Sequence, residues 1–193
     1  MKLVIIKYNA GNIRSVTFAL ERIGVHAFVT DDAAEISSAD KVIFPGVGEA
    51  SSAMNYLKER NLDALVTSLK QPVLGICLGM QLMCRHSEEG NTTCLGIFDQ
   101  QVKKFENKLK VPQIGWNKIN HLKSILCNGV KEDAYMYFVH SYYAELGTNT
   151  IASTDYDISY SSGLQKNNFY AVQFHPEKSS DAGQRILENF INV

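Results

Sequence analysis

One cysteine, Cys77, stands where an apolar strand is expected to turn sharply into a helix. Residues 73–76 are typical of a short buried strand, and residues 78–84 carry apolar side chains at helical spacing. Gly75 and Gly79 flank the cysteine at minus two and plus two, as glycines flank the serine of a G-x-S-x-G nucleophile elbow. Such a turn holds a thiol beside the first N–H groups of a helix, which favour negative charge. This segment is consistent with a nucleophile or with a buried core cysteine.

A nucleophilic thiol would need a base, because a free thiol has a pKa near ~8.5 and is mostly protonated at neutral pH. Among five histidines, His175 ends an apolar strand and is followed by Pro176 and Glu177. Residues two apart on an extended segment point to the same side, so the Glu177 carboxylate could orient the His175 imidazole. A solvated histidine and glutamate at a strand end is the alternative. Together with Cys77, the pattern predicts a Cys77–His175–Glu177 triad.

The other four histidines carry weaker signals. Two, His26 and His86, are interpreted as structural or solvent-facing. His121 lies in a polar turn region, and His140, which follows an apolar strand, is ambiguous.

Size and composition limit the class of protein. The chain has 193 residues, 45% hydrophobic and 20% charged, with a net charge of −1. We expect one domain with a substantial core, and no broad electrostatic surface for nucleic acid or an anionic membrane. No apolar run reaches the ~18 residues of a membrane span. The short apolar run at residues 3–6 predicts a first strand rather than a secretory signal, and hence a cytoplasmic protein.

The cysteines predict neither a metal site nor disulfides. None of the four is paired in a C-x-x-C motif or followed by a histidine at zinc-finger spacing: Cys77, Cys84, Cys94 and Cys127. In a cytosolic chain they are expected to be reduced thiols.

Strand and helix signals alternate through the first half of the chain. Strands are expected at residues 3–7, 25–29, 41–44 and 73–76, with helices at residues 13–23, 49–70 and 78–84, the second of them broken near Asn61. This order predicts a parallel sheet with helices on both faces. Ligands of such sheets bind at the carboxyl ends of the strands, where Gly46-Val47-Gly48 and Cys77 would lie.

The second half is richer in strands. They are expected at residues 95–105, 115–119, 135–139, 150–153, 158–165 and 169–174, with a turn at residues 166–168 and a closing helix at residues 182–191. The whole chain is therefore predicted to be a single α/β domain with one mixed sheet.

At this point the motifs resemble a known family. Pro45-Gly46-Val47-Gly48, residues 75–81 and His175-Pro176-Glu177 follow one another as in a class I, triad-type glutamine amidotransferase domain. The resemblance covers essentially the whole of residues 1–193. It implies a flavodoxin-like fold with a mixed, mostly parallel sheet and helices on both faces.

Finer features are most similar to the glutaminase subunits of imidazole glycerol phosphate synthases. They lie at residues 8–15, 46–48, 115–117, 140–142 and 175–179. One departure is at the start, where that group usually has Asp-Tyr-Gly and this chain has Lys7-Tyr8-Asn9. The departure leaves the triad intact and concerns the first loop and its partner contacts.

The resemblance implies a reaction and roles for particular residues. Cys77 would attack the side-chain amide of glutamine to form a thioester, with His175 as base and Glu177 as its orienting acid. The oxyanion would be held by the backbone N–H of Leu78 and by one N–H of the Gly46-Val47-Gly48 strand, whose glycines would let a peptide rotate. Gln81 and the His140-Ser141-Tyr142 segment would bind glutamine. No cofactor and no metal are implied.

The resemblance also implies a partner. Ammonia would pass along a sheltered path to the (β/α)₈-barrel cyclase subunit of the synthase, in histidine biosynthesis. The candidate interface residues are Asn12, Trp116, Asn117 and Lys178.

Several alternatives remain open at this stage. They are a glutaminase subunit of anthranilate or aminodeoxychorismate synthase, one that serves sugar amination in surface-polysaccharide synthesis, a cysteine hydrolase or peptidase of similar architecture, and a subunit without activity.

Overall fold

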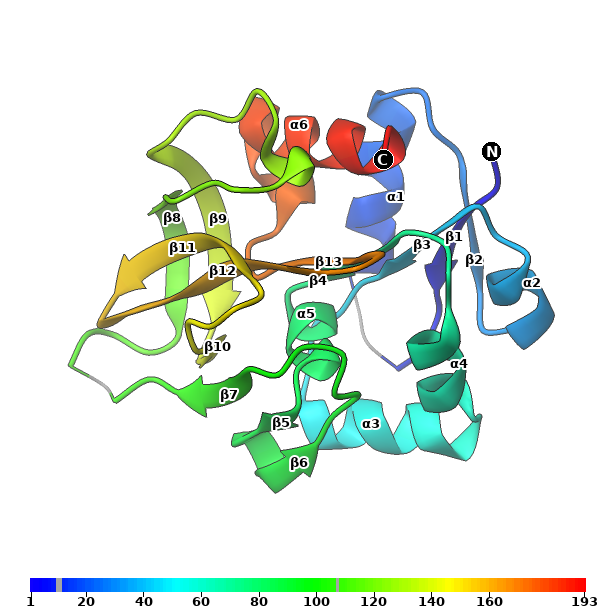
Figure 1. Ribbon diagram of the computed structural model, residues 1–193, viewed down its shortest axis with the longest axis horizontal. Coiled ribbons are helices and arrows are strands. Elements are labelled where there is room, and N and C mark those ends of the chain that lie inside the picture. Colours follow the sequence, from blue (N-terminus) through cyan, green and yellow to red (C-terminus); the bar gives the residue numbers. More distant parts are fainter. Residues whose placement is uncertain (10–11, 107) are drawn as a thin grey trace.

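A parallel sheet forms the centre of the computed structural model, which describes residues 1–9, 12–106 and 108–193 (Figure 1). Its strands are β1 (Leu3–Ile6), β2 (Ala27–Thr30), β3 (Lys41–Phe44), β4 (Val73–Ile76) and β13 (Phe169–Val172). They lie in the order β2-β1-β3-β4-β13, and each neighbouring pair is parallel. The predicted parallel sheet is confirmed.

Helices cover both faces of this sheet because its strands are apolar on both sides. In β1, Val4 and Ile6 pack into one core, and Leu3 and Ile5 pack into the other. The first core lies under α3 (Ala50–Glu59), α4 (Leu62–Ser68) and α5 (Leu78–Met83), and the second under α1 (Ile13–Arg22) and α6 (Ser180–Ile191). Successive side chains of these strands point to opposite faces of the sheet, and both sets are buried.

The sheet continues beyond β13 with antiparallel and short strands. β12 (Ile158–Lys166) pairs antiparallel with β13, and β11 (Thr150–Tyr156) pairs antiparallel with β12. The sheet then passes through β10 (Tyr142–Ala144), β7 (Gln101–Lys104), β5 (His86–Ser87) and β6 (Thr92–Thr93). A separate two-stranded sheet consists of β8 (Gln113–Ile119) and β9 (Ala134–His140), and it contributes to the core under α6. The mixed sheet is confirmed, but the prediction of one sheet misses this separate pair.

The predicted helix boundaries rest on residues with positive φ. Asn61 has a φ of 55° and separates α3 from α4, as the break near this position predicts. Gly24 has a φ of 75° and its N–H bonds the carbonyl of Glu21, which ends α1. Asn and Gly tolerate this backbone region better than other residues, so both breaks follow from residue type.

The expected strand at residues 95–105 is wrong over its first half. The N–H groups of Leu95, Gly96 and Phe98 bond the carbonyls of Leu82, Cys84 and Met83 at the end of α5, at 2.8 to 2.9 Å. Gly96 also has a φ of 68°, which a strand does not accommodate. This segment caps a helix, and only Gln101–Lys104 enters the sheet as β7.

Several short elements escape prediction. They are α2 (Ala33–Ser37), β5, β6, β10 and three 3₁₀ turns, η1 (Glu89–Asn91), η2 (Ile125–Cys127) and η3 (Pro176–Lys178). One of them had a local signal: the side chain of Asp32 accepts the N–H of Glu35 at 2.9 Å and caps α2. Every helix in the described ranges is too short or too polar to cross a membrane.

We predict that Gly79→Ala strongly destabilises the protein, because α5 lies directly against the end of β3. A Cβ at Gly79 would overlap the carbonyl oxygen of Phe44, which is backbone and cannot rotate away. Overpacking of this kind costs about 3 kcal/mol or more. Urea denaturation of the two proteins measures the difference in the free energy of unfolding.

Gly147→Ala is the matched control for Gly79→Ala. A Cβ at Gly147 meets only the side chain of Gln100, whose end can move aside. If Gly79→Ala lowers the free energy of unfolding by no more than Gly147→Ala does, the close approach of α5 and β3 is contradicted.

Candidate active site

Cys77 stands in a strained turn between β4 and α5. Its φ of 52° and ψ of −109° are unfavourable for a residue with a side chain, and such strain costs roughly 1–3 kcal/mol. Its N–H bonds the carbonyl of Val172 in β13 at 2.8 Å. A Cβ at Gly75 would lie 3.0 Å from the backbone nitrogen of Met80, and one at Gly79 would strike Phe44. The geometry is that of the nucleophile elbow which the glycine spacing predicts.

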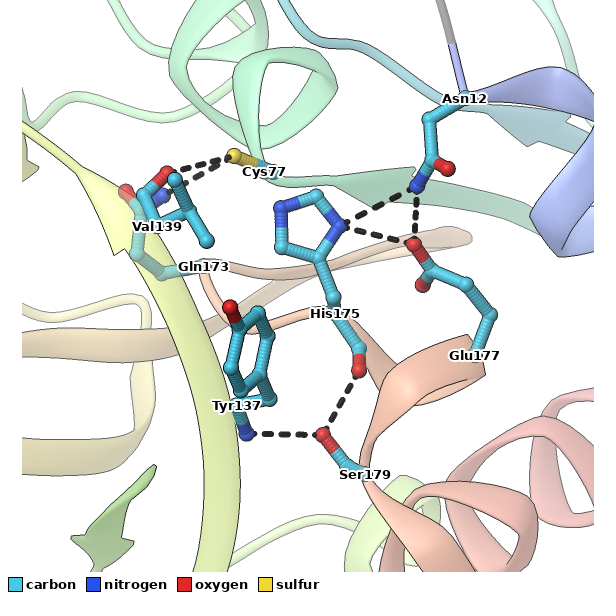
Figure 2. A network of polar contacts seen from close by, with 8 residues as sticks. All are labelled: Asn12, Cys77, Tyr137, Val139, Gln173, His175, Glu177 and Ser179. Carbon is cyan, nitrogen blue, oxygen red and sulfur yellow. Dashed lines mark hydrogen bonds and ion pairs between the residues drawn. The ribbon is translucent and has the colours of Figure 1, made fainter. Parts of the chain in front are cut away.

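His175 and Glu177 form a buried pair at the end of β13. Nδ1 of His175 lies 2.8 Å from Oε1 of Glu177, and their side chains are 3% and 0% exposed. The side-chain amide of Asn12 donates to the same Glu177 oxygen and lies 3.5 Å from Nδ1 of His175. Figure 2 shows the His175 imidazole with Asn12 and Glu177 on one side and Cys77 on the other. The two motifs, about a hundred residues apart in sequence, therefore meet in one site.

The backbone of His175 is fastened to the second sheet. Its N–H bonds the carbonyl of Tyr137 in β9 at 2.9 Å. The hydroxyl of Ser179 donates to the carbonyl of His175 at 2.7 Å and accepts the N–H of Tyr137 at 2.9 Å (Figure 2). Ser179 is fully buried, so this link between η3 and β9 holds the histidine in place.

The neighbours of His175 raise its pKa. Burial by itself lowers the pKa of His175, but hydrogen bonding and charge at Cys77 and Glu177 raise it more, to about 10. The imidazole therefore binds a proton more readily than a free histidine does, and the Glu177 carboxylate would stabilise the imidazolium that results.

Two groups contact the sulfur of Cys77 besides the imidazole. Sγ donates to the carbonyl of Val139 in β9 at 3.8 Å and accepts from the side-chain amide of Gln173 at 3.6 Å. Both contacts appear as dashed lines in Figure 2. Gln173 follows β13 directly, two residues before His175, and alternation along an extended chain could have predicted it.

A pocket of about 330 Å³ opens above Cys77. It collects most of the residues that the sequence predicted for the oxyanion and for glutamine, together with the triad cysteine and histidine. They are Val47, Gly48, Cys77, Leu78, Gln81, Ser141, Tyr142 and His175. Gly46 is buried just behind this lining, next to Leu78 and Tyr8. The sequence missed Glu89, Pro112 and Val139 as further lining residues.

The predicted oxyanion donor is engaged within the protein. The N–H of Leu78 bonds the carbonyl of Gly46 at 3.2 Å. Gly48 has a φ of 121°, and a Cβ there would meet no atom within 4 Å, so the segment has open space beside it. In this conformation the Leu78 N–H is not free to bind another acceptor.

Gln81 and His140 are fixed by buried polar contacts at the pocket wall. The amide nitrogen of Gln81 donates to the Tyr142 carbonyl at 2.9 Å and to Oε1 of Gln173 at 2.8 Å. Nδ1 of His140 donates to the same Tyr142 carbonyl at 2.7 Å, and the hydroxyl of Tyr160 lies 3.2 Å from its Nε2. Both side chains shape the strand that carries Ser141 and Tyr142.

The four predicted interface residues lie at two places. Lys178 lines the mouth of the pocket, and Asn12 contacts the His175–Glu177 pair. Trp116 and Asn117 line a second, larger surface hollow of about 670 Å³, where the Trp116 side chain is 52% exposed. Within the described residues, no three His, Cys, Asp or Glu side chains gather as metal ligands would.

Comparison with known proteins places the chain in a family. The model of the class I glutamine amidotransferase family matches residues 4–193. Over 196 aligned residues the chain is 58% identical to imidazole glycerol phosphate synthase subunit HisH of Bacteroides fragilis, with all of both chains covered. The same subunit of Bacteroides thetaiotaomicron is 56% identical, also over both full lengths. The chain belongs to the class I glutamine amidotransferases. Within them it is a HisH-type glutaminase subunit of imidazole glycerol phosphate synthase, as the finer motifs predicted.

Solved structures confirm the fold of this glutamine amidotransferase. A crystal structure of a glutamine amidotransferase matches with a TM-score of 0.77 at 17% identity and covers 98% of this chain and 97% of that one. PurLQS from Thermotoga maritima matches with a TM-score of 0.74 at 15% identity, covering 99% and 97%. At this identity the matches show the fold alone.

We predict that His140 makes the glutamine amidotransferase fold less stable in acid. Burial lowers the pKa of His140 to about 4; the contact with the Tyr142 carbonyl partly opposes this, and the charge of His175 adds to it. Because the unfolded histidine titrates near ~6.5, the unfolded state binds more protons between pH 6.5 and 4, and stability falls as the pH falls through this range. The loss amounts to about 3 kcal/mol at pH 4.

Urea denaturation at pH 7 and pH 4.5 checks this prediction. In His140→Gln the loss of stability between the two pH values should be about 2 kcal/mol smaller than in the original chain. Equal losses in the two proteins would show that His140 is not buried in its neutral form.

Proposed function

We propose that this subunit hydrolyses glutamine in the pocket above Cys77 and delivers the ammonia to a (β/α)₈-barrel cyclase subunit. The observation that carries the proposal is the convergence of a strained cysteine, which lines the pocket, with a buried His175–Glu177 pair. An isolated core cysteine would need neither the unfavourable φ nor the paired imidazole. Amidotransferase relatives over the full chain support the same reaction.

The chemistry follows from the positions of three side chains. Cys77 gives its thiol proton to His175, and the resulting thiolate attacks the side-chain carbonyl carbon of glutamine, while the C–O π electrons move to oxygen to form an oxyanion. Collapse of this tetrahedral intermediate breaks the C–N bond, and the His175 imidazolium gives its proton to the leaving nitrogen. Neutral His175 then takes a proton from water, which attacks the thioester and releases glutamate. Glu177 keeps the imidazole oriented throughout.

Recognition of glutamine is assigned to the pocket wall. Gln81, Ser141 and Tyr142 supply neutral donors and acceptors, which suit the amide and carboxylate of the substrate. Glu89 adds the one carboxylate among the lining residues, and it accepts the N–H of Ala50 at 2.8 Å. Although burial raises the pKa of Glu89, the N–H contact opposes that shift, and a carboxylate here would pair with the α-ammonium of glutamine.

Control by the partner is assigned to the Gly46-Val47-Gly48 segment, which follows β3. In the described conformation the Gly46 carbonyl holds the N–H of Leu78, so the proposed oxyanion hole is closed. Rotation of the Gly46–Val47 peptide would remove this carbonyl and turn the N–H of Val47 toward the substrate. Two N–H donors would then face the oxyanion, which is the arrangement that acyl transfer requires.

The exposed aromatic face of β8 and β9 is the proposed partner contact. Trp116 packs edge-on against Tyr137, with ring centres 6.0 Å apart, and Lys178 lies over the Tyr137 ring. Large aromatic side chains with a neighbouring cation are typical of interface centres. A sheltered path matters because ammonia released into neutral water becomes mostly ammonium, which is not nucleophilic. A cytoplasmic location stays a prediction of the sequence.

The main test measures glutamine hydrolysis with and without the cyclase subunit and its nucleotide substrate. We expect stimulation by the cyclase, and a fall to background in Cys77→Ala, because no other group can form the thioester. Cys94→Ala, which removes a half-buried thiol outside the pocket lining, should keep the original rate. Absence of hydrolysis with any partner would refute the enzyme, and stimulation only by an anthranilate-type synthase would reassign its partner.

A second prediction concerns the N–H of Val47. Val47→Pro removes this donor and should lower the cyclase-stimulated rate by about 10²–10³, the usual effect of losing one oxyanion donor. Val47→Ala keeps the N–H and should retain most of the stimulated rate. Thermal unfolding of both variants checks the fold, and full stimulated turnover in a folded Val47→Pro protein would exclude Val47 as the donor.

A further inference from the structure

A row of buried amides connects the sulfur of Cys77 to the pocket wall. Gln173 is fully buried, and its amide nitrogen lies 3.6 Å from Sγ of Cys77. Its oxygen accepts from Gln81 at 2.8 Å, and the same Gln81 nitrogen donates to the Tyr142 carbonyl at 2.9 Å. These contacts join β4, β13, α5 and β10 at the nucleophile.

The Tyr142 carbonyl at the end of this row determines which way the two side-chain amides face. A backbone carbonyl can only accept, so the Tyr142 carbonyl requires the NH₂ group of Gln81 to face it. The second N–H of Gln81 then meets Gln173, which must present its oxygen in return. The NH₂ group of Gln173 consequently faces the sulfur. The chain of contacts thus aims an N–H donor at Cys77.

The two other contacts of Sγ suit different charge states. The Val139 carbonyl, 3.8 Å away, can accept a proton from the neutral thiol but offers nothing favourable to a thiolate. The Gln173 amide donates, so its contact with sulfur strengthens when the sulfur becomes negative. Loss of the thiol proton would therefore weaken the contact of the sulfur with the Val139 carbonyl and strengthen its contact with the Gln173 amide; Figure 2 shows both contacts.

We propose that Gln173 stabilises the Cys77 thiolate and directs it into the pocket. This proposal rests on the proposed function, because it takes Cys77 as the nucleophile. Gln173 is not a member of the predicted triad. Its contact is with the reacting sulfur itself, while Gln81 and Tyr142 act through it by fixing its amide. The cost of burying this amide is offset by its hydrogen bonds to both neighbours.

Alkylation of Cys77 by iodoacetamide tests this proposal on the full chain, without glutamine. Only the thiolate reacts, so the rate against pH reports its formation. In Gln173→Met, which keeps an unbranched side chain but removes the donor, we expect the midpoint of this profile to rise by about one pH unit. The rate at pH 7 should fall about tenfold. Mass spectrometry of the Cys77 peptide separates this reaction from that of the other thiols.

Two further variants make the test decisive. Gln173→Asn keeps an amide but withdraws it by one methylene from the sulfur, so it should also shift the midpoint upward. This variant provides the test if Gln173→Met does not fold. Gln100→Met removes another buried glutamine that does not line the pocket, and its profile should match that of the original chain. An unchanged midpoint in either folded Gln173 variant overturns the proposal.

Glutamine hydrolysis, measured in parallel, separates the two proposals. A Cys77-dependent hydrolysis with an unchanged alkylation profile in Gln173→Met refutes the role of Gln173 alone. Hydrolysis that survives in Cys77→Ala refutes the proposed function itself.

Discussion

The parallel pairing of β4 between β3 and β13 is the constraint on which the rest of the site depends. Gly75 lies opposite Phe44 on one side and Ala171 on the other. Because these strands run in one direction and in register, their carboxyl ends leave the sheet side by side. The segment at residues 46–48, Cys77 and the segment that carries His175 are therefore neighbours. A one-residue slip of any strand would turn its side chains to the other face.

Two sets of contacts hold Cys77 and His175 in place at the carboxyl ends of these strands. Gly79 lets α5 lie on the end of β3, and the cores on both faces of the sheet hold Cys77 at its unfavourable φ of 52°. The second sheet acts from the other side, since Ser179 and the Tyr137 backbone fasten His175. Strain at one residue thus persists because well-packed surroundings determine its position.

Polar contacts pair His175 with Glu177 but leave the N–H of Leu78 occupied. His175 and Glu177 are paired and buried, which positions the proposed base without the partner. The Gly46 carbonyl meanwhile occupies the N–H of Leu78. The proposed reaction therefore depends on a local peptide rotation at glycine residues rather than on assembly of the triad. Such a division suits a subunit whose product is useful only when a partner is present.

The sequence by itself determined the features that rest on local chemistry. Glycine spacing around Cys77 and the break at Asn61 depend on residue type within a few positions, so the elbow and the helix boundary were predictable. The pairing of His175 with Glu177 was predicted too, but from an extended segment, whereas Glu177 lies in the 3₁₀ turn η3. Long-range contacts were decided only by the tertiary structure. The segment at residue 96 became a helix cap, not a strand, because free carbonyls of α5 lay beside it. Glu89, which accepts from Ala50 in α3, and Ser179, which bonds Tyr137 in β9, likewise acquired their places from elements distant in sequence, since hydrogen bonding across the fold leaves no local pattern.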